Sequence, residues 1–137
     1  DIVRRLHERL ETLQGRRIAI LGLAFKPGTD DTRDSPALTV ADRLLAAGAD
    51  VVAFDPMVKV VDELPGLVMA DDPYSAMRDS AAVVLLTDWP EFANIDPIAM
   101  AHSMSGRLIV DGRNILDPDE ITAAGLDYIG IGRQKIN

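Results

Sequence analysis

The stretch from Arg17 to Pro56, RIAILGLAFKPGTDDTRDSPALTVADRLLAAGADVVAFDP, determines the class of fold. Ile18–Leu21 is a short unbroken apolar run, which is typical of a strand buried on both faces. Ser35-Pro36 marks the start of a helix, because serine can cap the first turn and proline loses no hydrogen bond there. We expect this helix to span 36–47, with Gly48 as its stop, and 51–54 to form a second strand.

The alternation of strands and helices continues along the chain. Short apolar runs predict strands at 67–69, 82–86, 108–110 and 128–129, and helical segments are expected at 72–79, 90–93, 97–103 and 118–124. Strands separated by helices imply right-handed βαβ crossovers and a mostly parallel sheet covered on both sides. We therefore predict an α/β fold, a Rossmann-like three-layer sandwich.

The first residues have the pattern of a helix that connects this domain to another. Ile2, Leu6, Leu10 and Leu13 recur at helical spacing, with charged residues between them. The sequence has no initiator methionine and no clear cap before Ile2. We interpret residues 1–14 as the tail of an interdomain connecting helix and 15–137 as the domain proper. A native chain start after processing is the alternative.

Composition restricts the classes of partner. The 137 residues fit a single domain, and the net charge of −8 argues against a nucleic-acid or anionic-membrane surface. No apolar run approaches the roughly 20 residues that span a bilayer. There is no cysteine, which fits a cytoplasmic protein and excludes disulfides, cysteine metal sites and a cysteine nucleophile on this chain.

The longest segment at the expected ligand edge is Gly22–Pro36. Ligands of open parallel sheets bind outside the carboxyl ends of the strands. The segment contains neither G-x-G-x-x-G nor G-x-x-x-x-G-K-[ST]. Lys26 offers a mobile cation for a phosphate, and Arg33 offers a planar fork for two oxygens. The pattern alone favours a solvated lysine and an ion-paired surface arginine, although structureless loops of this length are usually functional.

Further candidates follow the other strands. Gly112 permits a tight turn that could aim Arg113 into the crevice, and a turn in which Asn114 bonds its own backbone is an equal alternative. Asp55 could hold a ribose hydroxyl or simply end its strand. Thr87 and Asp88 end the central strand, and Asp88 is equally a helix cap.

The remaining polar residues do not form a reactive set. Trp89 and Phe92 are expected to pack in the core, and the G-x-G at 130–132 opens no helix and is assigned no role. Of the two histidines, His7 lies on the charged helix and His102 lies in a helical stretch with no evident acidic partner. We therefore predict no catalytic residue and no metal site on this chain.

Several stretches together resemble the C-terminal domain of the UDP-glucose/GDP-mannose dehydrogenase family. They occur in the family's order from about Arg17 to Arg133, and the first is long and specific. These stretches are LGLAFKPGTDDTRDSPAL (21–38), AFDPMV (53–58), LLTDWPEF (85–92), VDGRNILDP (110–118) and YIGIGR (128–133).

The resemblance implies that this chain is one part of an enzyme and does not catalyse the reaction alone. Family enzymes oxidise the C6 alcohol of a nucleotide sugar to a carboxylate in two hydride transfers to NAD, with a cysteine carrying a thiohemiacetal and then a thioester. The cysteine and most other catalytic groups lie in the N-terminal and central domains of the same polypeptide, and NAD is bound mainly by the N-terminal domain. We therefore expect no turnover from this fragment. The full-length enzymes are expected to be homo-oligomers.

The family motif also implies roles for individual residues. Phe25 and Lys26 match the Phe-Lys pair that contacts the nucleotide sugar. Arg33 matches an arginine that reaches NAD on the other domain, and Arg113 matches one that contacts substrate. Two other classes of function remain open: a receiver-like signalling module, suggested faintly by Asp55 and Thr87, and an oligomerisation domain that binds no ligand.

Overall fold

The computed structural model describes residues 1–131 and contains one six-stranded sheet. The strands lie in the order β3-β2-β1-β4-β5-β6, and every neighbouring pair is parallel. This order is that of the Rossmann fold, and the direction of winding changes between β1 and β4. The strands are β1 (Arg17–Leu21), β2 (Asp50–Phe54), β3 (Val68–Met69), β4 (Ala82–Leu85), β5 (Leu108–Asp111) and β6 (Asp127–Gly130).

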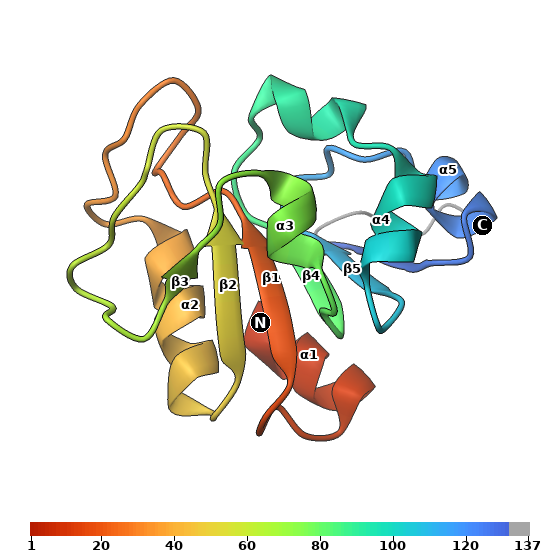
Figure 1. The fold of residues 1–137 in the computed structure, drawn as a ribbon, viewed down its shortest axis with the longest axis horizontal. Coiled ribbons are helices and arrows are strands. Elements are labelled where there is room, and N and C mark those ends of the chain that lie inside the picture. The colour runs from red at the N-terminus through yellow and green to blue at the C-terminus, as the bar shows by residue number, and fades with distance from the viewer. Residues whose placement is uncertain (132–137) are drawn as a thin grey trace.

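Helices cover both faces of the sheet (Figure 1). Side chains of α1 and α2 pack into one apolar core, and those of α3, α4, α5 and η1 pack into the other. The predicted three-layer α/β sandwich is therefore confirmed. The helices are α1 (Ile2–Leu10), α2 (Pro36–Ala46), α3 (Pro73–Met77), the 3-10 helix η1 (Pro90–Asn94), α4 (Pro97–Ser103) and α5 (Pro118–Ala123).

Alternate residues of each central strand enter opposite cores. In β1, Ile18 and Ile20 belong to the core under α1 and α2, whereas Ala19 and Leu21 belong to the core under the other helices. All four are inaccessible to solvent. The unbroken apolar runs in the sequence follow from this burial on both faces.

Most helices begin with the same local chemistry. Proline opens α2, α3, α4 and α5, and the preceding side chain accepts a hydrogen bond from a backbone N–H of the first turn. Proline has no N–H to leave unpaired at this position. Helix α3 is shorter than the expected 72–79, because Asp72 is its cap and Arg78 has already left the helical conformation.

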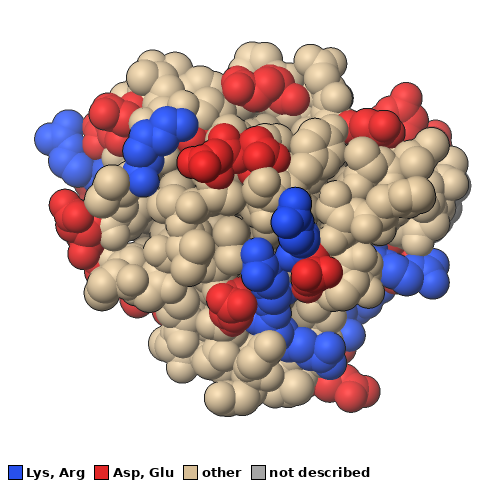
Figure 2. Space-filling model, in the orientation of Figure 1, with Lys and Arg blue, Asp and Glu red and all other residues tan. Residues whose placement is uncertain are grey.

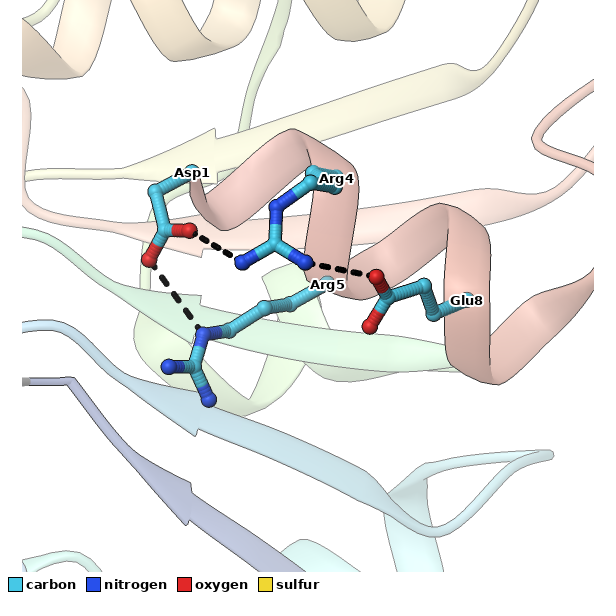
Figure 3. A network of polar contacts seen from close by, with 4 residues as sticks. All are labelled: Asp1, Arg4, Arg5 and Glu8. Atoms are coloured by element: carbon cyan, nitrogen blue, oxygen red, sulfur yellow. Dashed lines mark hydrogen bonds and ion pairs between the residues drawn. The ribbon is translucent and has the colours of Figure 1, made fainter.

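Helix α1 packs against the sheet. Leu6 and Leu13 are buried in the core that α2 shares. The helix ends at Leu10 because Glu11 adopts a φ of 67°, so Leu13 reaches the core from beyond the helix. On the exposed side, Arg4 bridges Asp1 and Glu8 (Figure 3). Such exposed pairs contribute little to stability.

Charges of both signs lie on the face seen in Figure 2, including its upper left, where Figure 1 places the loop after β1. None of the helices within residues 1–131 combines the length and the apolar character needed to cross a bilayer.

Gly22 sits at the point where the winding of the sheet reverses. Its φ is +97°, and its backbone N–H donates to the Phe54 carbonyl oxygen at 2.8 Å. A Cβ added to Gly22 would lie 2.5 Å from the Cβ of Thr87. Only glycine satisfies both the left-handed backbone and this close approach of the loops that follow β1 and β4.

We predict that Gly22→Ala destabilises the protein by about 2–5 kcal/mol, because it adds a steric clash to backbone strain. Gly28→Ala is the matched control, since Gly28 has a φ of +87° but no neighbour within 4 Å of a new Cβ. The control should cost only about 1–2 kcal/mol. Urea unfolding of both variants measures the difference, and equal losses would contradict the importance of the close approach.

Candidate functional site

The loop after β1 is anchored where it leaves the sheet. Both backbone N–H groups of Leu23 and Ala24 donate to Asp55 Oδ2, at 2.7 and 3.0 Å. The Leu23 carbonyl oxygen accepts from Ser35 Oγ at 2.8 Å, and the Ala24 carbonyl oxygen accepts from Thr87 Oγ1 at 3.0 Å. Four backbone polar groups in succession are therefore paired with buried side chains from three other segments, so the base of the loop is rigid.

This anchoring explains what Asp55 and Thr87 do. Asp55 is 1% exposed, and its Oδ1 also accepts from the backbone N–H groups of Met57 and Val58 at 2.9 Å. Thr87 is buried as well. The idea that Asp55 is placed for a ribose hydroxyl is not supported, because backbone groups use both of its oxygens and shield them from solvent.

Beyond the anchor, the loop presents Phe25 and Lys26 to solvent. The Phe25 N–H donates to the Asp31 carbonyl oxygen at 2.8 Å and closes the outer part of the loop. The Phe25 side chain is 56% exposed, unlike most large apolar side chains of the protein. Within residues 1–131, the Lys26 ammonium has no ion-pair partner. An exposed phenyl ring beside a free cation suits recognition better than folding.

Arg33 lies in the same loop and is held by Asp31. Its Nε and Nη2 donate to the two Asp31 carboxylate oxygens, each at 3.1 Å, and its backbone N–H donates to Oδ1 at 3.0 Å. The Arg33 side chain is nevertheless 88% exposed. Phe25, Asp31, Arg33 and Asp34 line a shallow hollow of about 310 Å³. The ion pair expected for Arg33 from the sequence is therefore present, and its partner is Asp31. The Arg33 side chain still faces solvent.

Arg113 projects from a turn fixed by a buried carboxylate. Asp111, at the end of β5, is 0% exposed and accepts from Arg113 N, Leu116 N and the Tyr128 hydroxyl. Gly112 lies against β4, where an added Cβ would approach the Leu85 carbonyl oxygen to 2.8 Å. Glycine is therefore needed here for close packing.

The contacts of the neighbouring residues bear on their alternative interpretations. Asn114 adopts a φ of 56°, and its side-chain amide donates to the Ile131 carbonyl oxygen at 3.1 Å. Asp88 does not cap η1, whose N-cap residue is Trp89. Instead Asp88 faces Arg113, with Oδ1 3.6 Å from Nη2.

The structure brings the predicted site residues to one edge of the sheet in two groups. Phe25 and Arg33 line the same hollow, while Arg113 follows β5 beside the loop of β4. A hollow shared by Lys26 and Arg113 stays a prediction. Trp89 and Phe92 pack in the core, as expected.

Some features lie outside the site or outside the described residues. Gly132 and Arg133, the end of the last resembling stretch, are not among the described residues. Across residues 1–131, no three His, Cys, Asp or Glu side chains cluster closely enough to hold a metal ion. The structure adds two buried supports, Ser35 and Asp111, to the residues expected from the sequence. The only sequence signal for them is a polar residue directly before a helix or at the end of a strand.

Comparison with known proteins gives a consistent result. Residues 19–118 match the model of the UDP-glucose/GDP-mannose dehydrogenase family, UDP binding domain. A UDP-glucose 6-dehydrogenase from Rhizobium meliloti is 44% identical over 123 residues, which cover 88% of this chain and 28% of that relative.

Solved structures give the same picture. An NDP-N-acetyl-D-galactosaminuronic acid dehydrogenase from Methanosarcina mazei aligns with a TM-score of 0.84 and 32% identity, over 97% of this chain and 28% of its own. A UDP-glucose dehydrogenase from Pyrobaculum islandicum aligns with a TM-score of 0.77 and 36% identity, over 93% of this chain and 28% of its own. The chain thus spans less than a third of the length of these relatives.

We predict that Asp55→Ala lowers the free energy of unfolding by about 3–5 kcal/mol, because it strands four backbone N–H groups. Asp55→Asn, which keeps one acceptor oxygen, should cost less. Asp42→Ala, at an exposed position of α2, should change stability by no more than about 0.5 kcal/mol. Chemical denaturation measures all three, and a loss at Asp55 equal to that at Asp42 would refute the anchoring role.

Asp31 provides a pH-dependent test of its pair with Arg33. Hydrogen bonds from the Arg33 side chain and then from its backbone N–H hold the pKa of Asp31 below the ordinary value of 3.8. A lowered pKa means that the pair persists above pH 3.8 and is lost as pH falls through the lowered value. Carboxyl ¹³C NMR should give a titration midpoint below 3.8 that rises in Arg33→Ala. An unchanged midpoint in that variant would contradict the pairing.

Proposed function

Because the chain belongs to the UDP-glucose/GDP-mannose dehydrogenase family and carries its UDP-binding domain, we propose that it is the C-terminal substrate-binding part of an NAD-dependent nucleotide-sugar 6-dehydrogenase. The observation that carries the proposal is the rigid anchoring of the loop after β1, which presents Phe25 and Lys26 at the ligand edge of the sheet. The whole enzyme would oxidise the sugar C6 alcohol to a carboxylate. UDP-glucose is the proposed substrate, since the curated relatives are UDP-glucose 6-dehydrogenases.

In this proposal, Lys26 and Arg113 bind the diphosphate of the nucleotide sugar. A nucleotide-sugar diphosphate carries about two negative charges, and two cations at a site that excludes water can balance them. Lys26 can bind the diphosphate without breaking an ion pair to any described residue, and Arg113 retains donors beyond the one that faces Asp88. The exposed ring of Phe25, the residue before Lys26, would supply an apolar contact. This chain's role is therefore to bind and orient the substrate.

NAD would be bound mainly by the parts of the enzyme outside this chain, where it accepts hydride from the substrate. On this chain Arg33 is the residue proposed to contact it. The residue fits an anionic cofactor, because its guanidinium is exposed and lines a hollow, although Asp31 engages two of its nitrogens. Closure of the ligand-filled cleft between domains would exclude water and align the sugar with the nicotinamide.

We also propose that residues 1–14 connect this chain to the central domain, with α1 as the tail of the connecting helix, and that 15–137 form the binding domain. The burial of Leu6 on α1 and of Leu13 just beyond it fixes this segment to the core. A homo-oligomeric enzyme, a cytoplasmic location and a role in polysaccharide biosynthesis complete the proposal. The cysteine-free composition is compatible with that location.

The alternative functions fit the geometry less well. A receiver module needs an accessible phospho-acceptor carboxylate, whereas backbone N–H groups enclose Asp55. An oligomerisation domain without a ligand gives no reason for a rigid loop to expose Phe25 and a Lys26 that has no ion-pair partner within residues 1–131. Addition of UDP-glucose tests the oligomerisation hypothesis. A ligand at 100 times its dissociation constant raises the free energy of unfolding by about 2.7 kcal/mol, whereas a domain that binds no ligand gains nothing.

Substitutions in the full-length enzyme test the assigned roles. We predict that Lys26→Ala and Arg113→Ala each raise the KM for UDP-glucose roughly tenfold to a hundredfold, because each removes a charge-assisted hydrogen bond. Arg33→Ala should mainly raise the KM for NAD. Steady-state kinetics with each substrate varied in turn measure both effects.

Arg43→Ala is the matched control, since Arg43 is an exposed cation on α2. It should leave both KM values unchanged, which separates the specific contacts from a general loss of positive charge. Unaltered kinetics in the Lys26, Arg33 and Arg113 variants would remove the proposed roles.

A further inference from the structure

Asp88 is an exposed carboxylate on a fixed backbone. It lies between Thr87 and Trp89, which are both buried, while its own side chain is 47% exposed. Thr87 is tied to the Ala24 carbonyl oxygen, and Trp89 packs in the core under η1. The backbone on each side of Asp88 is therefore held in place, and its carboxylate is presented from a defined position at the sheet edge.

Arg113 is presented from an equally fixed position next to it. Leu85 and Asp111 are paired across β4 and β5, so the loops that follow these strands leave the sheet side by side. The Gly112 N–H donates to the Leu85 carbonyl oxygen at 2.8 Å, and the Arg113 N–H donates to the buried Asp111 carboxylate at 3.2 Å. Only the long side chain of Arg113 remains free to change its direction.

The contact between the two side chains restricts Arg113 without saturating it. Asp88 Oδ1 lies 3.6 Å from Arg113 Nη2, and both side chains are about half exposed. A pair so open to solvent adds little to folding. The guanidinium has five N–H donors, so a contact at Nη2 leaves the Nε and Nη1 donors available to a second anion. Arg33 differs, because Asp31 engages both its Nε and its Nη2.

We propose that Asp88 is a positioning residue that orients the Arg113 guanidinium toward the diphosphate of the substrate. A flexible arginine loses rotamer freedom when it binds, and a neighbouring carboxylate that restricts it beforehand reduces that loss. Asp88 itself touches no substrate atom in this scheme. The inference rests on the proposed function, since the orientation of Arg113 affects binding only if Arg113 contacts the ligand.

A double-mutant cycle in the full-length enzyme tests the proposal, with UDP-glucose as the varied substrate. Asp88→Ala should raise the KM roughly threefold to fivefold and leave kcat unchanged, and it should have no further effect in an Arg113→Ala background. Asp88→Asn, which keeps the oxygen that faces Nη2, should recover most of the loss. Glu91→Ala is the matched control, because it removes an exposed acid from the neighbouring turn, and it should leave the KM unchanged.

The outcomes distinguish a failure of the proposed function from a failure of the positioning role of Asp88 alone. If Arg113→Ala leaves the KM unchanged, the proposed function fails and the role of Asp88 fails with it. If Arg113→Ala raises the KM but the Asp88 effect is absent or fully additive, only the positioning role is overturned. A lower KM in Asp88→Ala also overturns it, because Asp88 would then compete with substrate for Arg113. Equal melting temperatures of the variants exclude misfolding as the cause.

Discussion

The site depends on the complete pairing of four backbone groups at Leu23 and Ala24. Their N–H groups meet a buried carboxylate, and their carbonyl oxygens meet two buried hydroxyls. A backbone that leaves a sheet without such partners would have to lie in water or incur the cost of unpaired polar groups. Here the chain remains buried for three residues after β1 and then emerges abruptly, so that Phe25 and Lys26 become the first exposed side chains.

The three cations of the edge differ in how much of their hydrogen-bonding capacity is already used. Lys26 has no partner among the described residues, Arg113 has one distant carboxylate at a single nitrogen, and Arg33 shares two nitrogens with Asp31. An anion can bind Lys26 without displacing a described residue, whereas an anion that binds Arg33 must share its guanidinium with the Asp31 carboxylate. In a chain of net charge −8, such local pairing decides which cations remain available to a ligand.

The sequence was sufficient for the fold because its signals are local. Apolar runs such as Ile18–Leu21 and the cap-proline pairs mark strands and helix starts directly, and their alternation predicts a mostly parallel sheet. The order of the strands is known only from the structure. The sequence also identified the segments that follow the carboxyl ends of the strands. It could not tell that Asp55 is buried while Asp88 is exposed, since both are aspartates that follow a strand. Their difference comes from contacts across more than 20 residues of chain, such as those between Asp55 and Leu23.

The burial of both faces of the sheet has a consequence for how the strands are aligned. In a sheet with one wet face, a slip of one residue exposes apolar side chains and is strongly penalised. In β1 such a slip would only exchange Ile18 and Ile20 for Ala19 and Leu21 between two equally dry layers. The hydrophobic pattern therefore encodes little about registry here. That information resides in the polar residues just past the strand ends, above all Asp55 and Thr87, whose hydrogen bonds form in one alignment only.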